Sequence, residues 1–312
     1  MIIDKIEIAP GENKTIKLNV GNLPSGGVMD LQVMVFRSKI PGPTVLLVGG
    51  VHGDEINGVE IIRRGLRSKL FRGLIKGTVI AIPIVNVHGF INFERTLPDG
   101  KDINRSFPGS IRGSLASRVA SKLTQHILPL VDIGIDFHTG GRKIHNHPQI
   151  RVSEKDERAM ELADVFGVDF IVRSNMISKS LRKESFQKNI PMLVYEAGES
   201  LRLDNYSIEE GYLGISRVLK HLEMINGDFP ARESISLKSN RWIRASQSGL
   251  FVFYKSSGDM VMAGEVIGSI SSPYGDRYTE VKTKEEGYIF GHNNMPVVHV
   301  GEPLFHIGYV KD

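Results

Sequence analysis

The chain has 312 residues, 41% hydrophobic and 24% charged, which is the composition of an ordinary globular protein and excludes disordered and fibrous classes. It contains no cysteine, so disulfides, cysteine-ligated zinc and thiol nucleophiles are excluded, and a bound metal must be held by His, Asp or Glu. The formal net charge of +4 is small and the basic residues are dispersed, so we expect no nucleic-acid partner, and an anionic substrate is mildly favoured.

The first residues, Met1 to Lys5, lack the pattern of a secretory signal peptide, and no apolar run approaches the roughly 20 residues that a membrane-spanning helix needs. We therefore expect a cytoplasmic protein with no membrane partner, and the sequence is compatible with a homo-oligomer. Apolar and polar residues alternate in pieces of residues 1–40, such as 15–20 and 31–35. This alternation predicts antiparallel edge strands with one solvated face.

The next element is a near-continuous apolar run at 45–48, which is typical of a strand buried on both faces. It ends in a glycine turn that carries His52 and Glu55, and Asn57 is placed to cap a helix that extends to about Leu70. A strand end is rigid, so ligands mounted there keep their geometry. Zinc accepts a histidine nitrogen together with a carboxylate oxygen, so His52 and Glu55 are the first two candidate metal ligands.

Strands and helices then alternate up to about residue 226. We expect strands at 78–86, 131–137, 168–172 and 193–195, and helices at 113–128, 153–166 and 208–224. This alternation predicts a mixed α/β sheet with helices on both faces, in which sites gather at the carboxyl ends of the strands. His52, His138 and Glu196 each follow an apolar strand directly.

These positions predict a catalytic metal centre. We expect His52, Glu55 and His138 to bind one zinc ion, since three protein ligands leave a coordination position for water. Asp136, two residues before His138, is placed to orient an imidazole. Glu196 is the best candidate for a general base that takes a proton from water and passes it to a leaving nitrogen. A weaker alternative is Glu199, which lies beyond the following turn.

The polar loop at 96–109 is long enough to be functional in a compact domain. Arg105 offers a fork to a carboxylate and Asn104 adds directional hydrogen bonds, so the pair suits a substrate that bears a carboxylate. The alternative for one loop arginine is a solvated ion pair, for which Asp102 is the nearest partner. Arg95 could serve as a second cation or polarise a carbonyl group.

From about residue 230 the sequence changes to short apolar runs and glycine turns without helical spacing. We predict a separate small β-barrel or sandwich at residues 235–312, following a catalytic domain at residues 1–230. Glycine-led turns at 264–270 and 301–307 resemble those of biotinyl and lipoyl carrier barrels. The modified lysine of those carriers has no match near 273–276, so a structural role is favoured over an acyl carrier.

Four blocks together resemble the succinylglutamate desuccinylase/aspartoacylase family of the zinc carboxypeptidase superfamily, over roughly residues 40 to 225. They are His52-Gly53-Asp54-Glu55, Asp102-Ile103-Asn104-Arg105-Ser106-Phe107-Pro108-Gly109, Asp136-Phe137-His138 and Tyr195-Glu196-Ala197-Gly198. The resemblance implies an α/β zinc-carboxypeptidase-like fold with a C-terminal β domain. The site that it implies has zinc on His52, Glu55 and His138, Glu196 as general base, and Asn104, Arg105 and Arg95 on the substrate.

The resemblance is loosest at residues 139–151, where it is limited to the broad subgroup that includes diaminobutyrate deacetylases. Neither namesake substrate is therefore carried over. The catalytic tyrosine of carboxypeptidases also has no match, because strand alternation directs Tyr195 to the face opposite Glu196.

We therefore predict a zinc-dependent amidohydrolase, with one Zn²⁺ per chain, that cleaves the amide bond of a small N-acylated amino acid. One alternative is a metallocarboxypeptidase that removes the C-terminal residue of a peptide or protein. The two enzymes would use the same metal and arginine and differ in whether the cleft admits a polypeptide. A second alternative is a non-catalytic zinc-containing interaction protein whose C-terminal barrel binds a partner.

Overall fold

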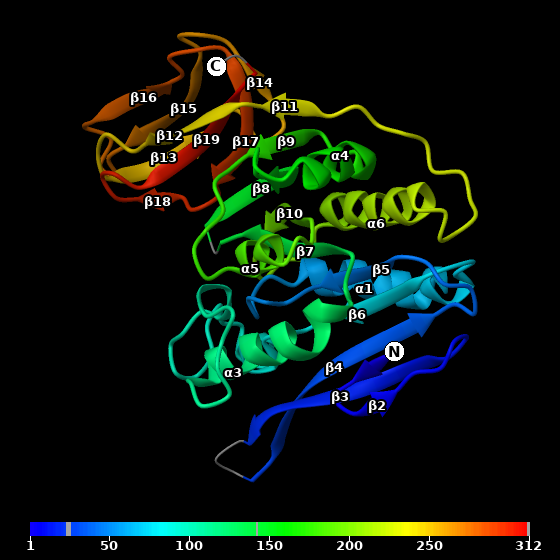
Figure 1. Ribbon diagram of the computed structural model, residues 1–312. Coiled ribbons are helices and arrows are strands. Elements are labelled where there is room, and N and C mark those ends of the chain that lie inside the picture. Colours follow the sequence, from blue (N-terminus) through cyan, green and yellow to red (C-terminus); the bar gives the residue numbers. More distant parts are fainter. Residues whose placement is uncertain (23–25, 142, 311–312) are drawn as a thin grey trace.

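The computed structural model describes residues 1–22, 26–141 and 143–310, so the last two residues of the predicted C-terminal domain lie outside the described part (Figure 1). The α-helices are α1 Asn57–Arg67, α2 Val87–Asn92, α3 Leu115–Lys122, α4 Glu157–Phe166, α5 Leu181–Gln187 and α6 Asn205–His221. Single turns of 3₁₀ helix lie at Leu70–Gly73, Ile103–Arg105 and Leu128–Leu130, and a π-helical turn lies at Leu123–Ile127. None of the described helices is long and apolar enough to cross a membrane.

The strands of the first two thirds of the chain are β1 Ile2–Ile3, β2 Ile6–Glu7, β3 Asn13–Asn22, β4 Val28–Arg37, β5 Thr44–Val48, β6 Thr78–Ile82, β7 Ile133–Gly140, β8 Ile144–Val152, β9 Phe170–Arg173 and β10 Met192–Glu199. Those of the last third are β11 Ile235–Leu237, β12 Ser239–Arg244, β13 Gly249–Phe253, β14 Met260–Val261, β15 Val266–Ser271, β16 Tyr278–Lys282, β17 Gly287–Asn293, β18 Val297–Val298 and β19 Pro303–Tyr309.

The largest sheet is mixed and runs in the order β12-β19-β17-β8-β10-β7-β5-β6-β4-β3. Its centre is parallel, since β10 pairs with β7, β7 with β5 and β5 with β6 in the same direction. The N-terminal strands β4 and β3 extend it antiparallel and leave β3 at the edge. Buried and exposed residues alternate along β3, which confirms the edge strand with one solvated face predicted from the sequence.

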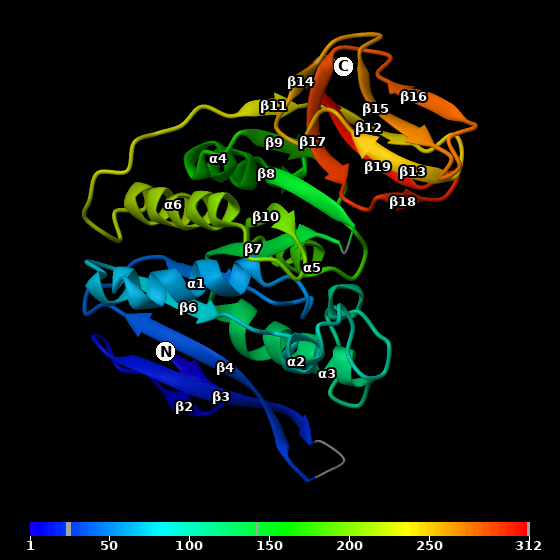
Figure 2. The ribbon, with the colours of Figure 1, turned by 180° about the vertical axis from the view of Figure 1, so that it is seen from behind.

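Helices cover both faces of this sheet (Figures 1 and 2). Along β5, Val45 and Leu47 belong to the apolar core that includes residues of α1, α4 and α6, whereas Leu46 and Val48 belong to the core that includes residues of α3 and α5. All four are buried, and full burial of one such side chain contributes about 1.5–3 kcal/mol. The predicted α/β sheet between helices, with a central strand buried on both faces, is confirmed.

Strand β8 was not predicted from the sequence. It pairs antiparallel with β10, and its other neighbours are β17 and, in parallel, β9. Its segment contains Pro148 and two histidines, His145 and His147, and therefore lacks the apolar run that marked β5 and β7. Through β8, the C-terminal strands join the central sheet rather than standing apart from it.

The C-terminal strands contribute to two sheets. Strands β17, β19 and β12 continue the large sheet, and β16, β15, β13 and β18 form a four-stranded sheet. Apolar residues from both sheets, among them Phe251, Ile289 and Phe305, form a shared core. This core agrees with an all-β C-terminal region, while the domain boundary near residues 230–235 stays a prediction.

The sequence predicts Asn57 as the cap of α1, and this prediction is wrong. Asn57 is the first residue of the helix, and Ile56 takes the capping position without a side-chain hydrogen bond. The Asn57 side chain instead donates to the Ala197 carbonyl oxygen (3.1 Å) and accepts from the Asp204 backbone nitrogen (3.1 Å). It thereby joins α1 to the end of β10 and the start of α6.

Candidate active site

The turn after β5 brings His52 and Glu55 to the carboxyl end of the sheet. Gly53 in this turn lies against the backbone at the start of α2, where an added Cβ would stand 2.0 Å from the Gly89 carbonyl carbon. Only glycine fits this close approach of two backbones. His138 lies near the end of β7, the strand that pairs with β5, so the turn after β5 and the end of β7 bring their side chains to the same point.

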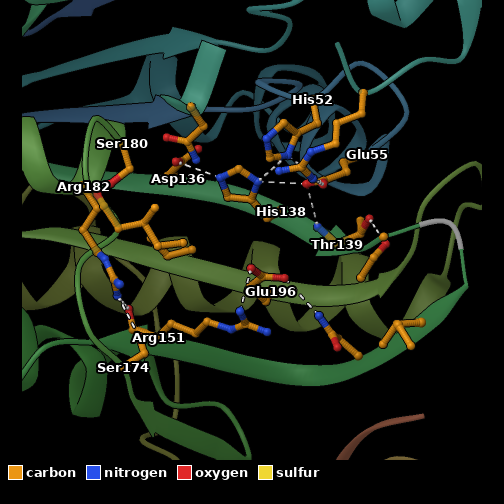
Figure 3. A pocket seen from close by; sticks show the side chains of 18 of the residues that line it. His52, Glu55, Asp136, His138, Thr139, Arg151, Ser174, Ser180, Arg182 and Glu196 are labelled. Carbon is orange, nitrogen blue, oxygen red and sulfur yellow. Dashed lines mark hydrogen bonds and ion pairs between the residues drawn. The ribbon is translucent and has the colours of Figure 1, made fainter. Parts of the chain in front are cut away.

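The side chains of His52, Glu55 and His138 converge (Figure 3). The Nδ1 atoms of the two imidazoles lie 3.2 Å apart. One Glu55 oxygen lies 2.7 Å from Nδ1 of His52, and the other lies 2.8 Å from Nδ1 of His138. The backbone nitrogen of Thr139 donates to the second oxygen (3.1 Å) and fixes the carboxylate. All three residues are at most 4% exposed, which is unusual for such polar groups unless they are paired or bind a metal.

The outward nitrogen of each imidazole also faces a carboxylate. His138 Nε2 lies 2.9 Å from Asp136, which confirms the predicted contact, and His52 Nε2 lies 3.3 Å from Asp102. A carboxylate on Nε2 favours the tautomer that carries its proton there and leaves the Nδ1 lone pair free. When both imidazoles are neutral, their Nδ1 lone pairs would therefore point into the centre of the cluster.

The electrostatics of the cluster favour a cation. Burial would raise the pKa of Glu55, but His52 and His138 hold it well below its ordinary value. Burial would lower the pKa of His138, yet Asp136 and Glu55 raise it well above its ordinary value. The pKa of His52 is raised against burial in the same way by Glu55 and Asp102. Protons and a metal ion would compete for the same nitrogen atoms.

Zinc fits this donor set. Its bonds to histidine nitrogen and carboxylate oxygen are about 2.0–2.2 Å long, so the ligand atoms of a tetrahedral site lie about 3.3 Å apart. One ligand atom from each of the three residues lies within 4.8 Å of the others. Two neutral nitrogens, one carboxylate and two supporting carboxylates are the arrangement of a site that keeps one position open for water.

A cavity of ≈ 310 Å³ opens on this cluster and is lined also by Asn104, Arg105, Glu196 and Trp242. Glu196 lies beside His138 in the sheet, because β10 and β7 pair at these two residues. Its carboxylate points from β10 into the cavity (Figure 3). The alternative, Glu199, accepts a hydrogen bond from Asn294 (2.6 Å) and is not among the described residues that line the cavity.

The polar loop contributes Asn104 and Arg105 to the cavity wall. The carbonyl oxygen of the Asn104 side chain accepts from the Leu181 backbone nitrogen (2.8 Å), so its NH₂ group remains as a donor. Asp102 does not pair with Arg105. It contacts His52 and lies 3.0 Å from Nη2 of Arg95, whose Nη1 donates to Glu55 (3.1 Å).

Several lining residues were missed in the sequence. Arg151 lies on the unpredicted strand β8, Arg182 on the unpredicted helix α5, and Trp242 on the C-terminal strand β12. Asn146, in the segment 145–147 for which the sequence allowed a place at the mouth of the cleft, also lines the cavity. No motif marks them, because each reaches the cavity only through the pairing of its strand or the packing of its helix. Tyr195 points away from the cavity, as predicted, and its hydroxyl donates to the Ser207 carbonyl oxygen (2.6 Å).

Comparison with known proteins agrees with this geometry. Residues 41–222 match the model of the succinylglutamate desuccinylase/aspartoacylase catalytic domain. N-alpha-acetyl-L-2,4-diaminobutyric acid deacetylase from Halomonas elongata is 28% identical, over 95% of this chain and 91% of that protein.

Solved structures share the fold. The crystal structure of a succinylglutamate desuccinylase/aspartoacylase from Rhodobacter sphaeroides superposes with a TM-score of 0.83 at 27% identity, covering 96% of this chain and 94% of the other. The product-bound ectoine utilization protein EutE (DoeB) from Ruegeria pomeroyi gives a TM-score of 0.85 at 21% identity, covering 95% and 94%. Both chains are matched over almost their whole length, so the C-terminal strands belong to the shared fold.

Proposed function

The chain belongs to the succinylglutamate desuccinylase/aspartoacylase family, and from this premise we propose that it is a zinc-dependent hydrolase that cleaves the amide bond of a small N-acyl amino acid. The observation that carries the proposal is the buried cluster of His52, Glu55 and His138, which opens on the same cavity as Glu196 and Arg105. A metal site, a carboxylate and a guanidinium around one cavity are the groups that this hydrolysis requires.

Zinc would be held by Nδ1 of His52, the Glu55 carboxylate and Nδ1 of His138. When bound there, it would polarise the acyl carbonyl group and make a water molecule more acidic. Asp136 and Asp102 would keep the two imidazoles in the tautomer that binds a metal. Arg95, which contacts both Glu55 and Asp102, would hold these two carboxylates in place and present its remaining charge to the acyl oxygen.

Glu196 would act as the general base. Its carboxylate takes the proton of the attacking water and donates it to the amide nitrogen as the carbon–nitrogen bond breaks. This transfer requires that the carboxylate face the scissile bond, and the pairing of Glu196 with His138 across β10 and β7 supports that position. Glu196 lines the cavity and Glu199 is not among the described lining residues, which supports Glu196 over its alternative.

Arg105 and Asn104 would bind the carboxylate of the substrate. A guanidinium can donate two parallel hydrogen bonds to a carboxylate, and the NH₂ group of Asn104 adds a third donor. Both residues lie in the loop at 96–109, whose 3₁₀ turn Ile103–Arg105 is anchored to α5 through Asn104 and Leu181. This anchor would hold the carboxylate site in a fixed position relative to His52, Glu55 and His138.

The cavity supports a small substrate over a polypeptide. Its volume of ≈ 310 Å³ is at the lower end of the range of about 300–1,000 Å³ that is usual for small-molecule sites. Trp242, from β12, lines one side of it. The C-terminal strands, which we propose to be a small β-barrel or sandwich domain, would thus narrow the cleft and exclude longer chains. The Halomonas deacetylase, by its name, acts on an N-acetylated amino acid.

The direct test is an assay of the zinc-loaded protein against two series of substrates. One series contains N-acetyl and N-succinyl derivatives of amino acids with basic, acidic and neutral side chains, and the other contains peptides of two to ten residues. We expect release of the free amino acid from the first series only. Release of C-terminal residues from the peptides would show a metallocarboxypeptidase, and a metal-loaded protein without activity on either series would favour the non-catalytic interaction protein.

A further inference from the structure

We infer that Asn146 is a positioning residue for Glu196, and that the C-terminal strand β17 holds it in that position. The inference rests on the proposed function, in which Glu196 transfers the proton. The sequence suggested nothing of this kind, because Asn146 lies in a strand that was not predicted, within the segment 139–151 that resembles the family least.

Two side chains of β8 hold the Glu196 carboxylate from both sides. Asn146 Nδ2 donates to Oε2 of Glu196 (3.0 Å), and Nη1 of Arg151 lies 3.4 Å from Oε1. Asn146 is only 3% exposed, so water does not compete freely for this hydrogen bond. A glutamate side chain has three rotatable bonds, and contacts at both oxygens fix the plane of its carboxylate as well as its place.

A β-bulge explains how both side chains reach the same carboxylate. Residues five apart on a regular strand point to opposite faces. Between the pairs Glu196–Gln149 and Gly198–Asn146, the register advances two residues along β10 but three along β8. The extra residue of β8 turns Asn146 back to the face of Arg151. Bulges of this kind occur next to active sites, where they redirect a side chain.

Strand β17 supports Asn146 from its other edge. It pairs with β8 at Gly291 and Asn146. A Cβ added to Gly291 would stand 2.9 Å from Oδ1 of Asn146, whereas its next neighbours, in His306 and Ile144, would be at 3.5 Å. The absence of a side chain at residue 291 therefore leaves room for the Asn146 amide in its present orientation and for little else.

The test compares Asn146→Ala in two backgrounds, with N-acyl amino acid turnover, metal content and thermal unfolding measured for each protein. In the wild-type background we expect kcat to fall by about 10- to 100-fold, as for a small displacement of a reacting group, with KM and zinc content unchanged. In the Glu196→Gln background the same substitution should change kcat by less than about twofold, because no carboxylate remains to be positioned.

Two further variants separate positioning from general damage. Asn293→Ala is the matched control. Asn293 is a buried asparagine of β17, and within residues 1–22, 26–141 and 143–310 its side chain bonds only to the backbone at Pro303 and Met295. This variant should leave kcat unchanged at a temperature where the protein is folded. Gly291→Ala should lower kcat when Asn146 is present and have no effect on kcat in the Asn146→Ala protein. Gly73→Ala is the control for Gly291→Ala, because an added Cβ at Gly73 would meet open space, and it should leave kcat unchanged.

The outcomes are distinct. A wild-type protein that hydrolyses no N-acyl amino acid, or a Glu196→Gln variant with full activity, would overturn the proposed function and this inference with it. If Glu196→Gln loses activity while Asn146→Ala keeps its kcat, the positioning role alone is wrong. It is also wrong if Asn146→Ala lowers kcat by the same factor in both backgrounds, because a purely structural loss would do that.

Discussion

Two sides of the cavity are built in different ways. The metal side, His52, Glu55 and His138, stands on neighbouring parallel strands of one α/β sheet. The β8–β17 wall, Asn146, Arg151 and Gly291, stands on antiparallel strands that are far apart in the sequence. The candidate ligands of the metal side follow apolar strands and contact one another. The wall has no such motif, and its side chains are directed by a bulge and by close backbone packing. In the proposed function, the first side supplies the metal site and the second orients Glu196.

The largest effect should come from the metal side. His138→Ala removes one of the candidate zinc ligands, so we expect loss of bound zinc and a fall in kcat of about a thousandfold or more, because several kcal/mol of transition-state stabilisation are lost with the metal. Metal content by mass spectrometry and turnover of the best N-acyl substrate measure both effects. Full zinc occupancy and activity in this variant would mean that the metal binds elsewhere, and His52, Glu55 and His138 would then not be the metal side of the cavity.

Glu196, which lies between the two sides, should have the next largest effect on kcat. Glu196→Gln keeps the shape of the side chain but cannot accept the proton, so kcat should fall by the ~10²–10⁴ that is typical of a general base, while zinc is retained. Glu199→Gln is the matched control, since Glu199 contacts Asn294 and does not line the cavity. A larger loss for Glu199→Gln than for Glu196→Gln would exchange the two roles.

The carboxylate site should affect binding more than turnover. Arg105→Lys keeps the positive charge but replaces the bidentate guanidinium by a single ammonium group. We therefore expect KM to rise by about 10- to 100-fold with kcat little changed. The matched control is Arg63→Lys, on the outer face of α1, where the guanidinium pairs with Glu60. Steady-state kinetics with one substrate separate the two constants, and an unchanged KM would mean that another group binds the carboxylate.

The sequence predicted that His52, Glu55 and His138 would come together, because the determinants of this cluster are local. A buried strand, a glycine turn and a histidine at the next strand end are visible in 45–55 and 131–138. The loop was predicted less well, since Asp102 pairs with Arg95 rather than Arg105, which depends on the path of the loop. The wall could not be predicted. A bulge changes which residues of β8 share a face, and the pairing of β8 with β17 joins segments more than 140 residues apart.

The last effect concerns the stability of the wall in acid and leaves turnover at neutral pH unchanged. His292, next to Gly291, has its pKa lowered to about 4 by burial and by the nearby His145 ring of β8, and its ring also contacts Ser257, Asn294 and Phe253. Since its pKa in the unfolded chain is near 6.5, the unfolded state binds more protons between pH 4 and 6.5. The stability from neutral His292 is present above pH 6.5 and is lost as the pH falls towards 4, on the order of 3 kcal/mol in all.

We therefore expect His292→Gln to reduce the difference in the free energy of unfolding between pH 7 and pH 5. The exposed His299, replaced by Gln, is the matched control and should leave this difference at its wild-type value. Trp242 is the only tryptophan of the chain and stacks on His306 of β19 (4.0 Å between ring centroids), so its fluorescence reports on the C-terminal strands that support the wall. An equal pH dependence in wild type and His292→Gln would show that acid acts elsewhere, and the wall would then owe its stability to β-pairing and apolar packing alone.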